Sequence, residues 1–177
     1  MTDAIALFAS ARRAGNTGAL IDRIAALAGF EVVDLAALRI APYDYEHSHR
    51  ADDFEPLFLR MLEYRHLVFA SPVYSYAVAP PMKVFIDRTT DFLDLEELRD
   101  EARRLRGKTG WVVCTSVYDT PPQSFVDAFA DNFAYFGMHF GGLAHVNSEN
   151  GYDAAAGEAE ARRFGGLLAA PSGGAAG

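Results

Sequence analysis

Short runs of apolar residues alternate along this chain with longer segments in which apolar residues recur every three or four positions. The short runs are typical of strands covered on both faces, and the longer segments are typical of amphipathic helices. The predicted strands are residues 4–9, 30–35, 67–70, 109–115 and 138–146. Strands that alternate with helices in this way indicate an α/β fold, in which a parallel sheet has helices on both faces.

The helices are predicted from the same spacing and from the residues that begin and end them. Their ranges are 17–28, 54–64, 80–92, 94–106, 121–136 and 154–169. Proline pairs are expected to open the third and fifth helices, and Gly137 is expected to end the fifth. In residues 94–106 acidic side chains precede basic ones, which the helix dipole favours. We therefore expect a solvated helix there rather than a recognition patch.

One predicted helix carries a stripe of phenylalanines at spacings of four, four and three residues. The stripe consists of Phe125, Phe129, Phe133 and Phe136. Residues at this spacing share one face of a helix, so the stripe must pack against a sheet or a partner chain. We expect it to belong to the core rather than to a cofactor site.

We expect five strands in the order 2-1-3-4-5, within one domain of residues 1–170 that is followed by a flexible tail of residues 171–177. In that order the chain leaves the neighbouring first and third strands toward opposite faces of the sheet, which opens a crevice at the carboxyl ends of the strands. Three loops are expected to meet there, namely residues 10–17, 71–79 and 115–121.

The first of these loops has the composition of a phosphate-binding loop. Its small and hydroxyl-bearing residues allow a phosphate to approach the backbone, and the start of the following helix favours negative charge. The expected phosphate-binding residues are Ser10, Arg12, Gly15, Asn16 and Thr17, with Arg12 as the counter-charge. The dinucleotide fingerprint and the Walker motif are both absent from this loop, which leaves a mononucleotide as the expected ligand. The alternative is an ordinary turn in which the Ser, Asn and Thr side chains cap the helix.

The other two loops are expected to enclose a flat ring such as that of a flavin. The second loop combines a stiffening proline with N–H groups and tyrosines, and the third combines hydroxyl groups with a tyrosine. The expected contacts are Pro72, Val73, Tyr74, Ser75, Thr115, Ser116 and Tyr118. Tyr74 and Tyr76 are expected either to stack on the ring or to border the substrate pocket. Asn147 and Glu149 are more remote candidates.

Composition excludes other classes of function. The formal net charge of −8 disfavours general nucleic-acid binding, and no apolar stretch approaches the roughly 20 residues that span a bilayer. We therefore expect a cytoplasmic protein that binds neither nucleic acid nor membrane. Cys114 is the only cysteine, which excludes disulfides within the chain and a cysteine-based metal framework. His47 and His49 lack a third ligand at a recognised spacing, so no metal site is expected.

The motifs in these loops resemble those of the flavodoxin-like NADPH-dependent FMN reductase family. The resemblance rests on Ser10-x-Arg12-x-x-Gly15-Asn16-Thr17, on Ser71-Pro72-Val73-Tyr74, on Pro81-Met82-Lys83 with Ile86-Asp87-Arg88, and on Gly107-Lys108, and it covers about residues 4–150. It implies a flavodoxin-like three-layer sandwich, noncovalent FMN, and two-electron transfer from NADPH or NADH to flavins, quinones, azo dyes or metal ions. The third loop departs from the pattern, because Val117-Tyr118-Asp119 stands where the family has a pair of glycines.

We therefore expect an FMN-dependent NAD(P)H oxidoreductase that passes a hydride from nicotinamide to FMN and on to a small acceptor. No catalytic side-chain acid or base is expected, because the flavin carries the chemistry. Two alternatives stay open, a flavodoxin-like electron-transfer protein that does not oxidise nicotinamides and an α/β domain without a ligand. We expect a homodimer or a dimer of dimers. The expectation rests on the phenylalanine stripe, on the tyrosine-rich loops and on the dimeric assembly of related reductases.

Overall fold

The five predicted strands form one parallel sheet in the order β2-β1-β3-β4-β5 in the computed structural model, which describes residues 3–170. The strands are β1 (Ala4–Phe8), β2 (Glu31–Asp34), β3 (His66–Ala70), β4 (Thr109–Ser116) and β5 (His139–Asn147). The helices are α1 (Asn16–Ala28), α2 (Phe54–Met61), α3 (Pro80–Arg88), α4 (Asp91–Asp94), α5 (Arg99–Arg103), α6 (Gln123–Tyr135) and α7 (Ala154–Ala169), with 3₁₀ turns η1 (Leu35–Ala37) and η2 (Glu96–Leu98). The predicted fold class and strand order are confirmed, whereas the predicted tail of residues 171–177 lies outside the described residues.

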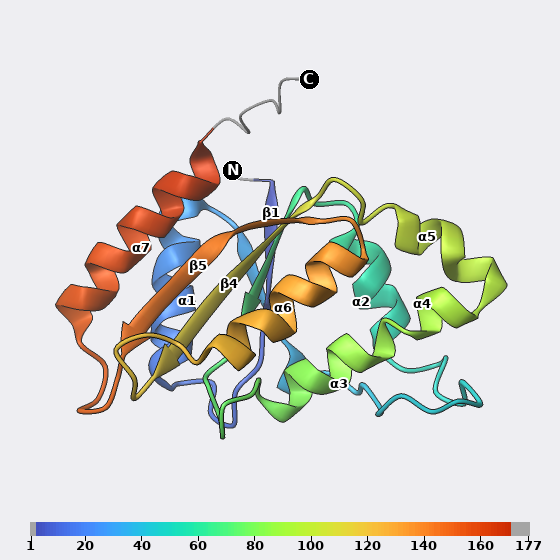
Figure 1. Ribbon diagram of the computed structural model, residues 1–177, viewed down its shortest axis with the longest axis horizontal. Helices are drawn as coiled ribbons and strands as arrows, with labels where there is room; N and C mark the ends of the chain where they lie inside the picture. The colour runs from blue at the N-terminus through green and yellow to red at the C-terminus, as the bar shows by residue number, and fades with distance from the viewer. Residues whose placement is uncertain (1–2, 171–177) are drawn as a thin grey trace.

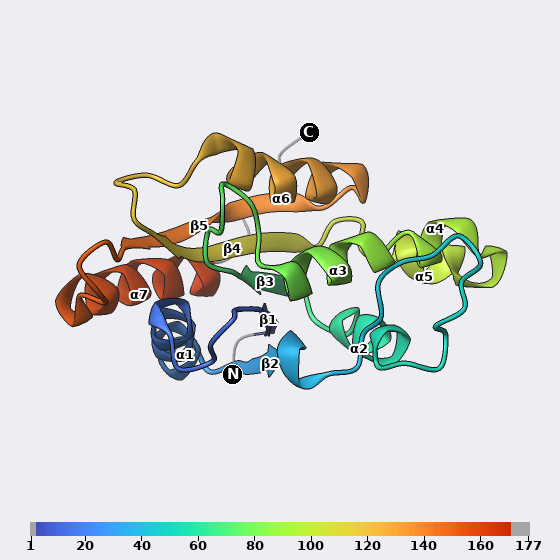
Figure 2. The same ribbon diagram turned by 90° about the horizontal axis from the view of Figure 1, so that it is seen from below.

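Helices cover both faces of the sheet, as Figures 1 and 2 show. α1 and α7 lie side by side on one face, and α2, α3 and α6 cover the other. Successive residues of a strand point to opposite faces, so Ile5 and Leu7 of β1 pack with α2, α3 and α6. Ala6 and Phe8 pack with α1 and α7. This burial on both faces explains the uninterrupted apolar runs in the sequence. No helix within residues 3–170 is long and apolar enough to cross a membrane.

The phenylalanine stripe of α6 faces the sheet. Phe125, Phe129 and Phe133 are buried in the core, and Phe136 follows the last residue of α6. Gly137 adopts a φ of +69°, a left-handed conformation that ends the helix as predicted. The prediction that the stripe belongs to the core is confirmed, and its buried residues are not a free surface for a second chain.

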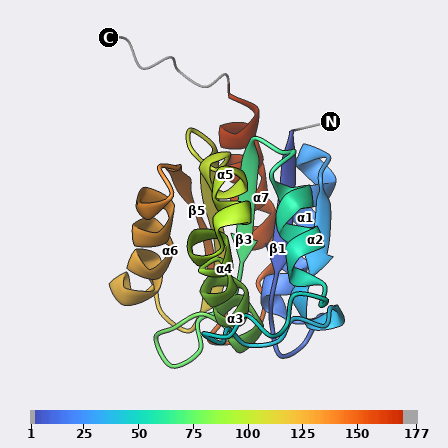
Figure 3. The same ribbon diagram turned by 90° about the vertical axis from the view of Figure 1, so that its right-hand side faces the viewer.

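Residues 94–106 do not form the single solvated helix that their charges predict. They are divided among the end of α4, the turn η2 and α5, and Figure 3 shows α4 and α5 following α3 along one side of the molecule. The backbone of Leu95 is extended, with φ −80° and ψ 117°, and the guanidinium of Arg99 donates to the carbonyl oxygen of Leu93 at 2.9 Å. The Arg99 side chain thus satisfies a carbonyl group where the helix breaks. Leu95 packs against the core, and this packing favours the break over the continuous helix that the charges predict.

Side chains of α7 protect the outer edge of β5. Glu160 accepts a hydrogen bond from the N–H of His145 at 3.0 Å, and Arg163 donates to the carbonyl oxygen of Leu143 at 2.6 Å. Glu160 and Arg163 are also paired with each other at 2.6 Å. An edge strand otherwise presents unpaired N–H and C=O groups to other chains, and these contacts remove two of them.

His66 and Trp111 form a buried side-chain hydrogen bond between β3 and β4. Trp111 Nε1 donates to His66 Nδ1 at 3.1 Å, so this ring nitrogen acts as an acceptor and the imidazole is neutral. Burial lowers the pKa of His66 from its usual 6.5, because the charged form loses its hydration in the interior. His66 therefore has a structural role in the core.

This lowered pKa predicts a loss of stability in acid. Below pH 6.5 the unfolded chain takes up a proton that folded His66 resists, so the free energy of unfolding falls as the pH drops toward the lower folded pKa. The His66→Asn variant keeps an acceptor for Trp111 and does not titrate. We expect it to lose less stability than the wild type between pH 8 and pH 5 in urea unfolding. An equal loss in both proteins would contradict this assignment.

Candidate cofactor site

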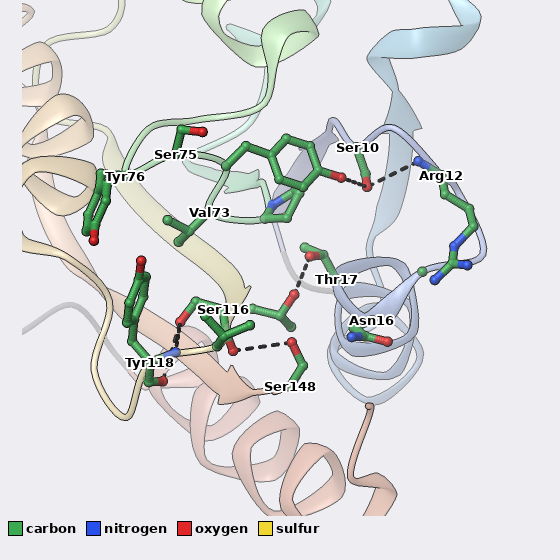
Figure 4. A pocket seen from close by; sticks show the side chains of 15 residues that line it. Ser10, Arg12, Asn16, Thr17, Val73, Ser75, Tyr76, Ser116, Tyr118 and Ser148 are labelled. Atoms are coloured by element: carbon green, nitrogen blue, oxygen red, sulfur yellow. Dashed lines mark hydrogen bonds between the residues drawn. The ribbon is translucent and has the colours of Figure 1, made fainter. Parts of the chain in front are cut away.

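A cavity of about 460 Å³ opens where β1, β3 and β4 end, and the three predicted loops line it. Figure 4 shows Arg12 and the start of α1 at one end, with Tyr76 and Tyr118 at the other. All of the residues predicted to bind a cofactor line this cavity, namely Ser10, Arg12, Gly15, Asn16, Thr17, Pro72, Val73, Tyr74, Ser75, Thr115, Ser116 and Tyr118. Tyr76, Val117 and Ser148 complete the lining. The volume lies within the range of about 300–1,000 Å³ that is common for small-molecule sites.

The start of α1 is free of side-chain caps. Gly15 precedes the helix with extended backbone, at φ −100° and ψ −176°, and no hydrogen bond joins a side chain of residues 3–170 to an N–H of the first turn. The alternative in which Ser, Asn or Thr side chains cap this helix therefore does not hold. The first N–H groups of a helix have no partner within the helix, and they attract anions together with the helix dipole.

Gly18 allows the loop to fold back against α1. A Cβ atom at this position would lie 2.0 Å from the carbonyl oxygen of Arg13, a distance that no side chain tolerates. Gly18 is absent from the residues predicted from the sequence. A glycine inside a first helical turn is the signal that points to such a close approach, because glycine is otherwise unfavourable there.

The two arginines of the first loop have different surroundings. Arg13 pairs with Asp22 through two hydrogen bonds of 2.5 and 3.0 Å, and its guanidinium lies 4.8 Å from the ring centre of Phe8. The guanidinium of Arg12 forms no ion pair with any residue of 3–170 and lines the cavity. Arg12 is therefore the candidate cation of this loop for an anionic ligand.

A buried hydrogen bond ties the first loop to the third. Thr17 Oγ1 and Thr115 Oγ1 are 2.6 Å apart, and both side chains are nearly inaccessible to solvent. The bond joins the first turn of α1 to the end of β4. Thr17 and Thr115 thus hold two walls of the cavity at a fixed separation.

A tight turn forms the tip of the second loop. The backbones of Tyr74 and Ala77 exchange two hydrogen bonds of 2.9 Å, and the residues between them, Ser75 and Tyr76, have φ angles of +48° and +67°. Two successive positive φ angles are typical of the turns that close two-residue hairpins, where glycine and asparagine are preferred. Serine and tyrosine adopt this backbone at a cost in strain, which is common in loops that bind ligands.

Tyr74 bridges the second loop to the first. Its hydroxyl lies 3.3 Å from Ser10 Oγ and accepts a hydrogen bond from the N–H of Ala11, also at 3.3 Å. Tyr74 thus lines the cavity with its hydroxyl directed to the first loop, and its two predicted roles, stacking on a ring or bordering the substrate pocket, stay predictions.

Tyr76 and Tyr118 close the other end of the cavity. Their rings are stacked, with centroids 5.6 Å apart and planes inclined by 26°, and Figure 4 shows their hydroxyl groups pointing toward each other. The contact with Tyr76 raises the pKa of the Tyr118 hydroxyl. The aromatic residues of the second and third loops therefore meet over the cavity.

Ser148, in the loop after β5, adds a residue that the sequence pattern does not single out. Its N–H donates to the carbonyl oxygen of Ser116 at 2.7 Å, which holds the start of this loop against the end of β4. The remote candidates Asn147 and Glu149 flank Ser148 and do not line the cavity.

His47, His49 and Cys114 are not among the residues that line the cavity. His47 Nδ1 is 2.9 Å from an oxygen of Asp91, and His49 Nε2 is 3.3 Å from an oxygen of Asp44. Burial raises the pKa of Cys114 to about 12, so its thiol is protonated and unreactive at neutral pH.

The sequence of residues 2–153 matches the family described as NADPH-dependent FMN reductase. The chain belongs to this family. FMN is therefore its cofactor, and NADPH or NADH is the electron donor. A relative from Bacillus subtilis (strain 168), YwqN, whose name describes an NAD(P)H-dependent FMN-containing oxidoreductase, is 28% identical over 142 residues. The match spans 74% of this chain and 77% of the relative.

Solved structures agree with this member of the FMN reductase family in fold. The Trp repressor binding protein from Bacillus subtilis superposes with a TM-score of 0.71 at 22% identity, covering 94% of this chain and 98% of that one. An FMN-dependent NADH-azoreductase from Bacillus anthracis str. Ames Ancestor, in complex with FMN, gives a TM-score of 0.67 at 8% identity, covering 93% and 96% of the two chains. These likenesses establish the flavodoxin-like fold.

The packing of Gly18 predicts that a single methyl group disrupts the loop of this FMN reductase. In Gly18→Ala the Cβ atom displaces the Arg13 carbonyl, so we expect a loss of about 1–3 kcal/mol in urea unfolding and weaker FMN binding by fluorescence titration. Gly165→Ala is the control, since a Cβ there in α7 meets open space. It should leave FMN affinity unchanged and add up to about 1 kcal/mol of stability. Similar FMN affinity in both variants would refute the role given to Gly18.

Proposed function

We propose that the cavity holds FMN with its phosphate against residues 10–17 and its ring between the second and third loops. The observation that carries the proposal is the juxtaposition of an uncapped helix start and the unpaired Arg12 at one end of the cavity. Helix N–H groups and a guanidinium fork are the donors that a phosphate dianion prefers. Aromatic residues occupy the opposite end, where a flat ring finds apolar contact and hydroxyl groups.

The protein's own contribution to the reaction is positioning. When bound, FMN accepts a hydride from the nicotinamide and passes two electrons on to the second substrate. Pro72 and Val73 supply a rigid wall to one side of the cavity, and Val73 is fixed by a 3.1 Å hydrogen bond from its N–H to the carbonyl oxygen of Thr115. Hydride transfer between a nicotinamide ring and a flavin ring is accelerated mostly by holding the two rings in a fixed orientation. No side chain of the cavity therefore has to supply a proton.

We further propose that the acceptor is a small molecule such as a quinone, a free flavin, an azo compound or a metal ion. The second and third loops carry the residues that such an acceptor meets first. The alternative function is electron transfer by bound FMN without nicotinamide oxidation. The family match and the name of the Bacillus subtilis relative favour the reductase.

The contrast between the two arginines tests the placement of the phosphate. Arg12→Ala removes a charge-assisted hydrogen bond at an exposed site, so we expect FMN affinity to fall about tenfold in a fluorescence titration. Arg13→Ala is the matched control. Its loss breaks the pair with Asp22 and removes the same charge from the loop, but FMN affinity should change by less than about threefold. Equal losses in both variants would mean that only general charge matters, and no loss in Arg12→Ala would refute the placement.

We also propose that the protein is a homodimer or a dimer of dimers. The buried stripe of α6 no longer supports this, but three tyrosines on the surface do, namely Tyr45, Tyr76 and Tyr135, which are 87%, 60% and 72% exposed. Closed two-fold dimers are the commonest homo-oligomers, and exposed aromatic residues are enriched at their interfaces. Light scattering at micromolar concentration with FMN bound should give at least twice the mass of one chain. A monomer mass would contradict the proposal.

A further inference from the structure

Ser116 is the residue of the cavity with the most crowded side-chain oxygen. Its hydroxyl accepts a hydrogen bond from the N–H of Tyr118 at 3.2 Å and lies 2.8 Å from His145 Nε2. The carbonyl oxygen of Tyr118 is a weaker partner at 3.4 Å. Ser116 is only 5% exposed, yet it lines the cavity. A serine hydroxyl has one hydrogen and two lone pairs, so these neighbours decide what it can offer to a ligand.

His145 of β5 contacts Ser116 through Nε2 and is not among the residues that line the cavity. Burial lowers its pKa, and the charge of Glu160 opposes that effect. Glu160 of α7 binds the backbone N–H of His145 and is itself paired with Arg163. On β4 the neighbouring Cys114 is a protonated thiol. On α6, which also packs against β5, the charged residues are Asp127 and Asp131.

The charge and the tautomer of the imidazole together determine the direction of this hydrogen bond. Protonated His145 must donate from Nε2 to Ser116 Oγ, and the Tyr118 N–H donates to the same oxygen, so both lone pairs are used. The hydrogen of Ser116 is then left with the distant Tyr118 carbonyl, or with an acceptor atom in the cavity. When His145 is neutral and its hydrogen is on Nδ1, Ser116 donates to Nε2 instead and has no hydrogen for the cavity.

We propose that His145 is a positioning residue that sets whether Ser116 donates a hydrogen bond to the bound flavin. The inference rests on the proposed placement of FMN, because the partner would be an acceptor atom on the polar edge of its ring. His145 touches neither the flavin nor the substrates, and no proton leaves the protein in this step. In this proposal the hydrogen of neutral His145 is on Nδ1, so that protonation at Nε2 releases the Ser116 hydrogen toward the cavity and strengthens FMN binding.

The pKa of His145 itself is the readout, measured by NMR of the imidazole in the protein without FMN and at saturating FMN. One neutral hydrogen bond changes FMN affinity by about three- to tenfold. Because binding of FMN and binding of the proton are linked, FMN should raise the pKa of His145 by the logarithm of that factor. His139, exposed at the start of the same strand, is an internal control, and FMN should leave its imidazole NMR signals unchanged. An unmoved pKa at His145 with FMN bound would overturn the proposal.

A variant separates this linkage from a general effect of FMN charge. Ser116→Ala lacks the hydroxyl that joins His145 to the cavity, so FMN should no longer raise the pKa of His145. The wild type should gain more FMN affinity than Ser116→Ala between pH 8 and pH 6. The FMN phosphate titrates equally in both proteins and cancels in the comparison. Retention of the pKa rise in Ser116→Ala would also overturn the proposal. Failure of the wild type to bind FMN at all would instead refute the proposed function, and this inference with it.

Discussion

The position of β1 between β2 and β3 determines where the cavity and its lining residues lie. From β1 the chain turns to α1 on one face of the sheet, and from β3 it continues to α3 on the other. Two loops that leave neighbouring strands toward opposite faces must separate, and the space between them is the cavity at the carboxyl ends of the strands. The apolar runs that bury both faces of the sheet therefore also create the site, although none of their side chains needs to contact the ligand.

Contacts between the three loops hold this cavity open in one shape. Thr17 and Thr115 join the first loop to the third, Tyr74 and Ser10 join the second to the first, and Val73 is bound to the end of β4. Each loop is thus fixed by another loop as well as by its own strand. A site that is ordered in this way loses less conformational entropy when a ligand binds.

The sequence predicts the parts of this protein that depend on local pattern. Continuous apolar runs identify the strands, and the turn and hydroxyl residues that follow them identify the cavity lining, because parallel strands bring their carboxyl ends to one edge. The break at Leu95 is not predictable in this way, since it depends on a side chain of Arg99 and on packing against the core. The stacking of Tyr76 on Tyr118 and the contact of His145 with Ser116 join residues 42 and 29 positions apart, and no local spacing encodes them.

Charge is distributed unevenly over a chain whose formal net charge is −8. Arg12 is the one basic residue among those that line the cavity at the carboxyl ends of the strands, so this cavity has a single cation within an acidic molecule. Such a cation is suited to the single phosphate group that the proposed placement of FMN brings there.

An anaerobic titration of the FMN-loaded protein with NADPH, and separately with NADH, decides whether this site works as a reductase. The flavin absorption band should bleach with about one equivalent of at least one of the two donors per FMN, because each nicotinamide delivers two electrons. If neither donor bleached the band while a chemical reductant did, the protein would bind FMN for electron transfer alone, and the function proposed for the cavity would be wrong.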